Sequence, residues 1–236
     1  MPEISVVMPV YNGEKIIGGA IDSILAQDFD DCEIVVVDDG STDATGRICK
    51  SYGDKLSYYK SEENMGIGAA RQRGVELSSG RYVCFLSTDD RLQPTFMSEM
   101  LAEAKKHQGG VVYCGFRLID ERFGLQGELT PKEFGSHEDF CVASLNMAYK
   151  DSISVNYSSI LAPREVFVAV PFDSSLRFGE DLDHILRAMK HFKFYPLKKV
   201  LVDIMIHAES ETSKKFFSIP ENNHKIIEKF WGYWRG

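Results

Sequence analysis

The sequence predicts an α/β fold in which a mixed, mostly parallel sheet is flanked by helices. Three observations support it: short apolar runs alternate with helical patterns in the first half, those runs are apolar on both faces, and acidic residues follow two of them. Strands of this kind are typical of parallel sheets covered on both sides, which bind ligands at the carboxyl ends of their strands. We therefore expect a site at that edge of the sheet.

The spacing of apolar residues and the residues that typically begin helices locate the expected elements of the first half. Strands are expected at residues 4–10, 33–37, 56–60 and 82–86, and helices at 14–27, 41–50, 68–77 and 94–106. Ile17 and Ile21 belong to a helical spacing of apolar residues. Ser41 or Asp43 can cap the second helix, and Pro94 suits the first turn of the fourth. The result is a β-α-β-α series.

The regular alternation ends after a fifth expected strand at residues 111–117. Residues 120–135 are Gly-rich and polar, and we expect them to form an insertion. The remaining expected elements are a helix at 137–149, a strand at 158–161, a helix at 181–191, a strand at 194–206 and an amphipathic, aromatic end at 222–234. Because no internal repeat or low-complexity linker is present, we expect one domain over 1–236, with halves 1–117 and 118–236.

Composition and charge exclude several classes of protein. A hydrophobic fraction of 44% with 26% charged residues is that of an ordinary globular protein. The net charge of -8 argues against a nucleic-acid binder, which needs clustered Lys and Arg. The five cysteines lack the close pairing of zinc sites and are expected to be reduced thiols. No apolar run approaches the ~20 residues that span a bilayer, so we expect a cytoplasmic protein.

Two acidic pairs occupy strand ends. Ser-Thr-Asp-Asp at 87–90 directly follows the strand at 82–86, where carboxylates could bind a divalent cation beside a phosphate group. Asp38 and Asp39 follow the strand at 33–37 and precede Gly40. A carboxylate there can accept a hydrogen bond from a nucleobase or a ribose hydroxyl. Solvated turns have similar sequences, so neither pair alone decides the function.

Five segments in order point to one family. They are Val-Val-Met-Pro-Val-Tyr-Asn at 6–12, Val-Asp-Asp-Gly-Ser-Thr-Asp at 37–43, the Asn-Met-Gly and Ala-Arg segment at 64–74, the acidic motif at 87–90, and Phe172-Asp173 with Gly179-Glu180-Asp181. Over most of its length the chain resembles the inverting family 2 glycosyltransferases, which have a GT-A, Rossmann-like fold. The resemblance implies transfer of a sugar from a nucleotide-sugar donor to a hydroxyl of a glycan or lipid-linked acceptor. The first half would bind the donor and the second half the acceptor.

The resemblance also assigns roles to single residues. Asp39 would bind the uracil of a UDP-sugar, and the backbone near Pro9 and Tyr11 would line the base and the ribose. Arg71 would approach the diphosphate, where a guanidinium can bond two oxygens; a helix-surface cation is the alternative. Asp181, at the start of the late helix, would be the general base that takes the proton of the acceptor hydroxyl. Helix capping is the alternative for this acid.

A Mn²⁺ or Mg²⁺ site is implied at Asp89, Asp90 and His207. We expect Asp89 to contact the nucleotide and ribose nearest the metal, and Asp90 to be a direct or water-mediated ligand. His207 resembles a late family residue that reaches the metal or the diphosphate, although a surface role is common for a lone His. The family commonly has Asp-x-Asp where this chain has Ser87 first. Because the diphosphate supplies oxygens, loss of one carboxylate need not abolish cation binding.

Three other functions are alternatives to sugar transfer. Ser87 lends support to a catalytically idle sugar-nucleotide-binding or scaffold protein. A nucleotidyltransferase usually begins with a Gly-rich, basic phosphate loop, whereas residues 4–13 contain a single glycine, Gly13, and no Arg. A dinucleotide-dependent oxidoreductase is disfavoured because no Gly-x-Gly-x-x-Gly follows the first strand.

The partners of the chain are less visible in its sequence. The aromatic end, 230–234, suits core packing, a homodimer contact, or peripheral association with the inner face of a membrane, and the first two are favoured. The common work of the resembled family points to surface polysaccharide biosynthesis. The donor sugar and the acceptor are not identifiable from the residues.

Overall fold

The computed structural model describes residues 1–140, 155–177 and 179–207. The strands in this part of the chain are β1 (Ile4–Val10), β2 (Cys32–Asp38), β3 (Ser57–Lys60), β4 (Tyr82–Phe85), β5 (Arg91–Leu92), β6 (Val111–Asp120), β7 (Gly124–Leu129), β8 (Ile160–Pro163) and β9 (Phe194–Ile206). The helices are α1 (Ile17–Leu25), α2 (Thr45–Ser51), α3 (Ile67–Leu77), α4 (Phe96–Lys106), α6 (Arg164–Ala169) and α7 (Glu180–Ala188), with 3-10 turns η1 (Gly53–Lys55) and η2 (Tyr157–Ser159).

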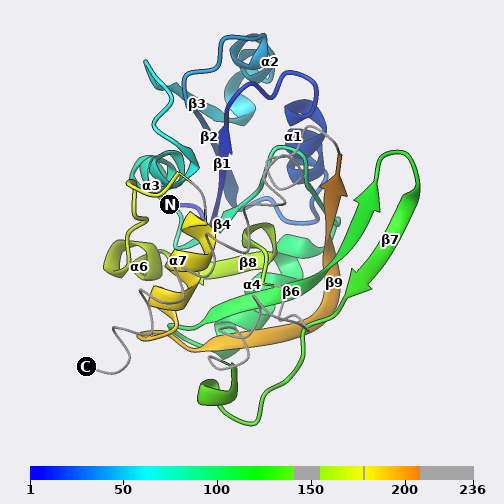
Figure 1. The fold of residues 1–236 in the computed structure, drawn as a ribbon, viewed down its shortest axis with the longest axis vertical. Coiled ribbons are helices and arrows are strands. Elements are labelled where there is room, and N and C mark those ends of the chain that lie inside the picture. The colour runs from blue at the N-terminus through cyan, green and yellow to red at the C-terminus, as the bar shows by residue number, and fades with distance from the viewer. Residues whose placement is uncertain (141–154, 178, 208–236) are drawn as a thin grey trace.

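One curled sheet runs through the molecule in the order β3-β2-β1-β4-β8-β6-β9-β5, with β7 beside β6 (Figure 1). Strands β1 to β4 are parallel to one another, as the β-α-β-α series predicts. Strand β8 enters antiparallel between β4 and β6, and β9 runs parallel to β6. The predicted mixed sheet flanked by helices is confirmed, with its continuous parallel part in the first half of the chain.

Both faces of the sheet are buried at β1, where successive residues point to opposite sides and every residue is buried. Val7 of β1 packs with Ala70 of α3 in a cluster that also includes residues of α6 and α7. The adjacent Met8 packs in the other cluster, with Ile21 of α1 and Met97 of α4. Fully burying an aliphatic side chain of this size stabilises the fold by about 1.5–3 kcal/mol, so the continuous apolar strands account for the two-sided core.

The expected elements agree closely with the observed ones where periodicity is strong. Strands β1 and β9 match their expected bounds, and the other expected strands and helices of the first half differ only at their ends. Strand β7 lies within the polar segment expected as an insertion, and α6 and β5 were not expected. Residues 137–140 are helical as predicted, whereas the rest of that helix and the aromatic end lie outside the described residues. No helix of the described ranges has the length and apolarity needed to cross a membrane.

The parallel strands end together at one edge. In the register of β1 and β2, Val10 lies opposite Asp38, and β4 runs in the same direction beside β1. Strand β9 reaches this edge from the second half of the chain, because β5, which directly follows the acidic motif, pairs antiparallel with it. The loops after β1, β2 and β4 and the end of β9 therefore form the predicted edge.

Candidate functional site

The loop after β1 is fastened to the loop after β2. The backbone N–H of Asn12 donates to Ser41 Oγ at 2.8 Å, and Asn12 Oδ1 accepts from the N–H of Thr42 at 2.9 Å. Asn12 has a positive φ of 51°, a conformation that Asn tolerates better than most residues. The neighbouring Pro9 is buried in β1, whereas the Tyr11 side chain is 52% exposed. The loop thus holds Tyr11 at the surface beside a rigid turn.

The Asp38-Asp39 pair supports the backbone around this turn. Asp38 is fully buried and accepts hydrogen bonds from the N–H of Ser41 at 2.7 Å and from the Tyr58 hydroxyl. Asp39 is 4% exposed, and its two oxygens accept from the N–H groups of Met65 and Gly66 at 2.9 and 2.8 Å. Asp39 therefore holds the loop that leads into α3 through its carboxylate.

Gly66 gives that loop its shape. It precedes α3 with φ 98° and ψ 156°, backbone angles that favour glycine. Two residues later, Gly68 lets α3 approach the start of α7 closely, because a Cβ built there would lie 3.4 Å from the Cβ of Glu180. Gly66 thus shapes the loop before α3, and Gly68 permits the close contact between α3 and α7.

Arg71 of α3 lies in the interior and forms an ion pair with Glu180. The nitrogen and oxygen are 2.5 Å apart, and the two side chains are only 6% and 7% exposed. The guanidinium also lies over the ring of Tyr157, at 4.7 Å from the centroid, and near those of Phe85 and Phe172. Burial raises the pKa of Glu180, and the Arg71 charge acts in the opposite direction. The structure thus gives Arg71 a protein partner that no sequence pattern predicted.

Asp181 follows Glu180 in the first turn of α7. Gly179 precedes the helix with φ 77°, and the Asp181 side chain is exposed to solvent. One of its oxygens accepts from the N–H of Leu182 at 2.7 Å, a local contact at the helix start. The Arg71 ion pair fixes the residue before Asp181, so the exposed carboxylate stands on an anchored turn.

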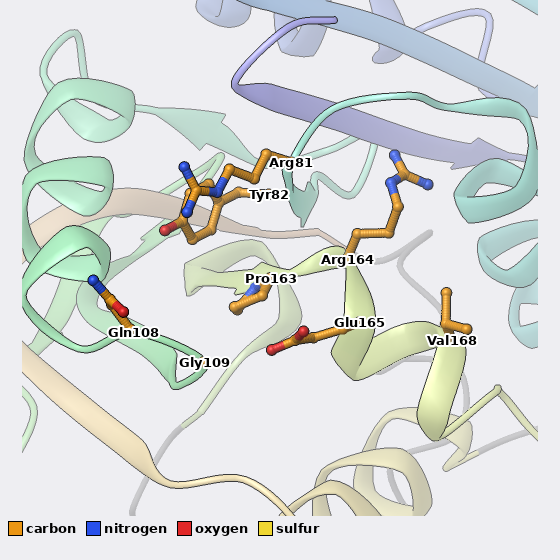
Figure 2. A pocket seen from close by; sticks show the side chains of 8 residues that line it. All are labelled: Arg81, Tyr82, Gln108, Gly109, Pro163, Arg164, Glu165 and Val168. Atoms are coloured by element: carbon orange, nitrogen blue, oxygen red, sulfur yellow. The ribbon is translucent and has the colours of Figure 1, made fainter.

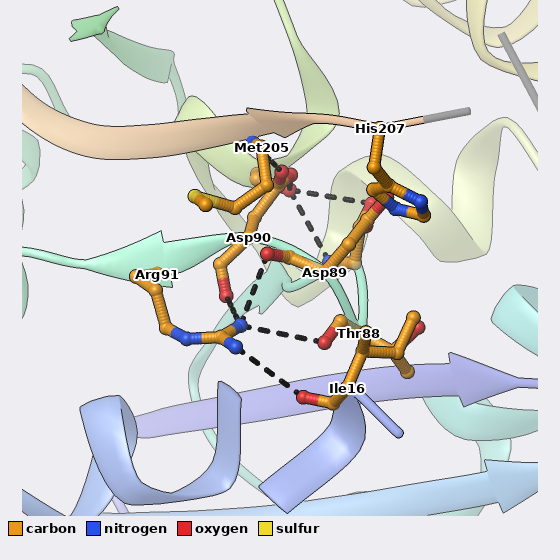
Figure 3. Close-up of polar contacts among 9 residues, drawn as sticks. Ile16, Thr88, Asp89, Asp90, Arg91, Met205 and His207 are labelled. Carbon is orange, nitrogen blue, oxygen red and sulfur yellow. Dashed lines mark hydrogen bonds and ion pairs between the residues drawn. The ribbon is translucent and has the colours of Figure 1, made fainter. Parts of the chain in front are cut away.

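The acidic motif after β4 divides its two carboxylates between different partners (Figure 3). Asp89 Oδ2 lies 3.2 Å from His207 Nε2, which comes from the end of β9. Asp90 is 3% exposed; its oxygens accept from Ser158 Oγ at 2.6 Å and from the N–H of Met205 at 3.2 Å. Burial and the neighbouring Asp89 charge raise the pKa of Asp90 to about 7. The structure therefore brings Asp89 and His207 together and turns Asp90 into the protein.

These residues fit a divalent cation as a two-ligand site. The described part of the chain holds no cluster of three or more His, Cys, Asp or Glu side chains that could hold a metal ion. The Asp89 carboxylate is a suitable ligand for Mn²⁺ or Mg²⁺ when a bound diphosphate supplies further oxygens, and the His207 imidazole at 3.2 Å adds a nitrogen ligand, which a transition-metal ion accepts more readily than Mg²⁺ does. Ser87, at the position of the absent acid, takes part in the Ser158 contacts: its N–H lies 3.2 Å and its Oγ 3.4 Å from Ser158 Oγ.

The turn η2 connects the acidic motif to α7. Ser158 bonds Asp90, and the adjacent Tyr157 hydroxyl hydrogen-bonds His184 Nδ1 of α7. His184 is stacked on Phe172, with ring centroids 4.4 Å apart. Burial lowers the pKa of His184 to about 3, so the imidazole is neutral. Sequence reasoning placed no function on Tyr157, Ser158 or His184, because their roles depend on partners distant in the chain.

Figure 2 shows a cavity whose lining includes none of the site residues described above. It is lined by residues that include Arg81, Arg164 and Glu165, at the amino end of β4 and the carboxyl end of β8. The Arg164 guanidinium is engaged in the fold, since it donates to the carbonyl groups of Gly80 and Val75 at 2.8 and 2.6 Å. We assign this cavity no part in the site at the opposite ends of the parallel strands.

Sequence comparisons place these features among known proteins. The profile described as Glycosyl transferase family 2 matches residues 5–151, more than half of the chain. An uncharacterized glycosyltransferase of Rickettsia prowazekii is 32% identical over 234 residues, covering 93% of this chain and 69% of the relative. Glycosyltransferase GlyA of Streptococcus pneumoniae is 36% identical over 125 residues, covering 52% of this chain and 18% of that protein.

Solved structures show a similar fold. TarS 1-349 of S. aureus in complex with UDP-GlcNAc has a TM-score of 0.74 at 22% identity, covering 97% of this chain and 65% of that one. The mannosyltransferase PcManGT from Pyrobaculum calidifontis, in complex with GDP-Man and Mn²⁺, has a TM-score of 0.65 at 19% identity, covering 93% and 61%. At these identities the similarity concerns the fold.

Proposed function

Because this chain belongs to glycosyltransferase family 2 and has its GT-A fold, we propose that it transfers one sugar from a UDP-linked donor to a hydroxyl group of a glycan or lipid-linked acceptor. The observation that carries the proposal is the pairing of Asp89 with His207, 3.2 Å apart, at the carboxyl edge of the parallel strands. Two side chains from distant parts of the chain meet there as potential cation ligands, beside loops suited to a nucleotide.

Asp39 is the proposed contact of the uracil base. Its oxygens already accept one N–H group each, and each has a second lone pair that can accept the N–H of a base. The backbone near Pro9 and the exposed Tyr11 would line the base and the ribose. The similar TarS structures contain UDP and UDP-GlcNAc, whereas PcManGT contains GDP-Man, so the base is the property to test first.

Asp89 and His207 would hold Mn²⁺ or Mg²⁺ against the donor diphosphate. When bound, the cation would neutralise the negative charge of the departing diphosphate. Asp90, with both oxygens bonded inside the protein, would act through the position of Asp89 or through a water molecule. Arg71, buried against Glu180, would support the site through α7.

Asp181 is the proposed general base. It would accept the proton of the acceptor hydroxyl while that oxygen attacks the anomeric carbon from the face opposite the diphosphate, so that the configuration inverts without a covalent enzyme intermediate. Two observations support this role: the side chain is exposed to an incoming acceptor, and it stands in the first turn of α7 beside Glu180, which the ion pair with Arg71 anchors.

The test is a nucleotide panel followed by donor turnover. The purified protein is heated with UDP, GDP, ADP or CMP, each with Mn²⁺ or with EDTA. A nucleotide at about 100 times its dissociation constant stabilises the native state by about 2.7 kcal/mol, which a melting curve resolves. Stabilisation by UDP that needs Mn²⁺, followed by release of UDP from a UDP-sugar, supports the proposal.

Two outcomes contradict it in different ways. Stabilisation by GDP alone would overturn the assignment of uracil as the nucleobase of the donor and would not contradict the proposed cation site. Nucleotide binding without turnover of any donor in the presence of candidate acceptors would favour the idle sugar-nucleotide-binding protein. The Asp89→Asn variant is the matched control, because it removes a proposed cation ligand while it keeps the size of the side chain.

A further inference from the structure

Arg91 binds the backbone of the acidic motif at three successive carbonyl groups (Figure 3). Its Nη1 donates to the oxygens of Thr88, Asp89 and Asp90 at 3.4, 3.0 and 2.7 Å. Its Nη2 reaches the carbonyl oxygen of Ile16, at the start of α1, at 3.4 Å. A single guanidinium thus connects the turn of the acidic motif to a helix of the first half.

Gly19 provides the place where the guanidinium lies. A Cβ built on Gly19 would stand 2.8 Å from both Cζ and Nε of Arg91, closer than real contacts allow. At the preceding position, a Cβ built on Gly18 would meet only the Tyr52 hydroxyl, at an ordinary 3.5 Å. The bare surface of α1 at Gly19 is therefore what lets Arg91 lie against the helix and face the carbonyl groups.

The turn that bears Asp89 is consequently held from two sides. From the α1 side, Arg91 binds its carbonyl oxygens. From the β9 side, the N–H of Met205 binds the Asp90 carboxylate and His207 contacts the Asp89 carboxylate. A cation site to which the described residues contribute two ligands depends strongly on their relative position, because few other contacts can compensate for a displaced carboxylate.

We propose that Arg91 is a positioning residue of the donor site: by binding the carbonyl oxygens of residues 88–90 from its seat on Gly19, it holds Asp89 toward His207. This inference rests on the proposed function, in which Asp89 and His207 bind the cation. The planar guanidinium is required, because Nη1 binds the carbonyl oxygens of residues 88–90 while Nη2 reaches that of Ile16, and the single nitrogen of a lysine ammonium cannot take both positions.

Two substitutions disturb this arrangement independently. Arg91→Lys keeps the charge and removes the planar donors. Gly19→Ala leaves Arg91 in the chain and displaces its guanidinium, the movable end of the side chain; alanine also favours the helix more than glycine does, so the variant is expected to fold. Gly18→Ala is the matched control, since it makes the same change at the adjacent position of α1 without meeting Arg91.

The measurement is the Mn²⁺ concentration that gives half-maximal donor turnover, together with kcat at saturating Mn²⁺. Mutation of a residue that holds a metal ligand in place typically lowers metal affinity or activity 10- to 100-fold. We therefore expect the Mn²⁺ concentration for half-maximal turnover to rise on the order of tenfold or more in Arg91→Lys and Gly19→Ala. We expect no change in Gly18→Ala. A purely structural Arg91 would lower the melting temperature and leave the Mn²⁺ requirement unchanged, which would overturn the inference.

A second readout does not need activity. The imidazole resonances of His207, assigned with a His207→Gln variant, report the contact with Asp89 at fixed pH and without metal. We expect them to shift in Gly19→Ala and to stay in place in Gly18→Ala; identical spectra in both variants would overturn the positioning role. If the wild type shows no Mn²⁺-dependent turnover, the proposed function fails, and the resonances still decide whether Arg91 positions Asp89.

Discussion

The Arg71 guanidinium and the Glu180 carboxylate lie 2.5 Å apart in the interior, although 109 residues separate them in the sequence. The ion pair joins α3 to the first residue of α7, directly before Asp181. The N-terminal loop of the same helix α3 is held by Asp39. Helix α3 therefore connects Asp39, the proposed contact of the uracil, with Glu180, the residue before the proposed general base.

Removal of the Glu180 charge is expected to destabilise the protein strongly. Glu180→Gln leaves the Arg71 charge buried without its counterion, which typically costs about 3–5 kcal/mol. Urea denaturation measures the change in the free energy of unfolding. In the double variant Arg71→Met with Glu180→Leu, much of the loss should be recovered. The control is Glu76→Gln, whose exposed pair with Arg73 on the same helix should change stability by only about 0–1 kcal/mol; equal effects of the two Glu variants would contradict the prediction.

Loss of the Asp181 carboxylate is expected to impair transfer and to spare donor binding. A positioned general base typically contributes about 10²–10⁴-fold to the rate, so Asp181→Asn should lower kcat by that order. UDP binding, measured by calorimetry with Mn²⁺, should stay close to that of the wild type. Asp54→Asn, in the exposed turn η1, is the control for loss of an acid. Parallel loss of transfer and binding would count against Asp181 as the base.

The Asp89 and His207 variants should share one defect. Because both side chains are proposed cation ligands, Asp89→Asn and His207→Ala should each raise the Mn²⁺ requirement of turnover by about tenfold or more, as is common for weakened metal sites. Titration of activity with Mn²⁺ gives the value. His191→Ala, an exposed histidine after α7, is the matched control. A normal Mn²⁺ requirement in His207→Ala would remove this residue from the site.

His184 should make the protein less stable in acid. An unfolded His takes up a proton below its ordinary pKa near 6.5, whereas burial keeps the folded side chain neutral until about pH 3. Between these values the unfolded state binds more protons, so stability falls as the pH falls through this window. Urea unfolding at several pH values should show that the free energy of unfolding falls less steeply with falling pH in His184→Gln than in the wild type. Equal slopes would show that other groups dominate the acid response.

The sequence predicted the fold well where burial leaves a continuous pattern. Strand β1 is buried along its whole length, and its apolar run makes it recognisable. Strand β7 escaped prediction because its sequence, Gly-Leu-Gln-Gly-Glu-Leu, is polar and its residues are mostly exposed. Its strand conformation depends on pairing with β6, a contact that no local pattern of side chains reveals.

The candidate site was predictable in its parts and less so in its contacts. Acids at the ends of strands indicated the edge of the sheet, and the family resemblance pointed to His207 and Asp181, whose roles stay predictions. Spacing could not show that Asp90 turns inward to Ser158, or that Arg71 pairs with Glu180, because these partners lie 68 and 109 residues away. Such contacts depend on where β8 and α7 pack, and tertiary packing sets that position.

The position of η2 and β9 late in the chain limits when the site can form during synthesis on the ribosome. A nascent chain that has emerged only as far as β7 already contains Asp39, Asp89 and Asp90. It still lacks Ser158, which bonds Asp90, and the segment of β9 that brings Met205 and His207. The two carboxylates of the motif therefore obtain the full set of these partners only after β9 has been synthesised, so an incomplete chain cannot assemble the proposed cation site before the proposed general base, Asp181, is in place.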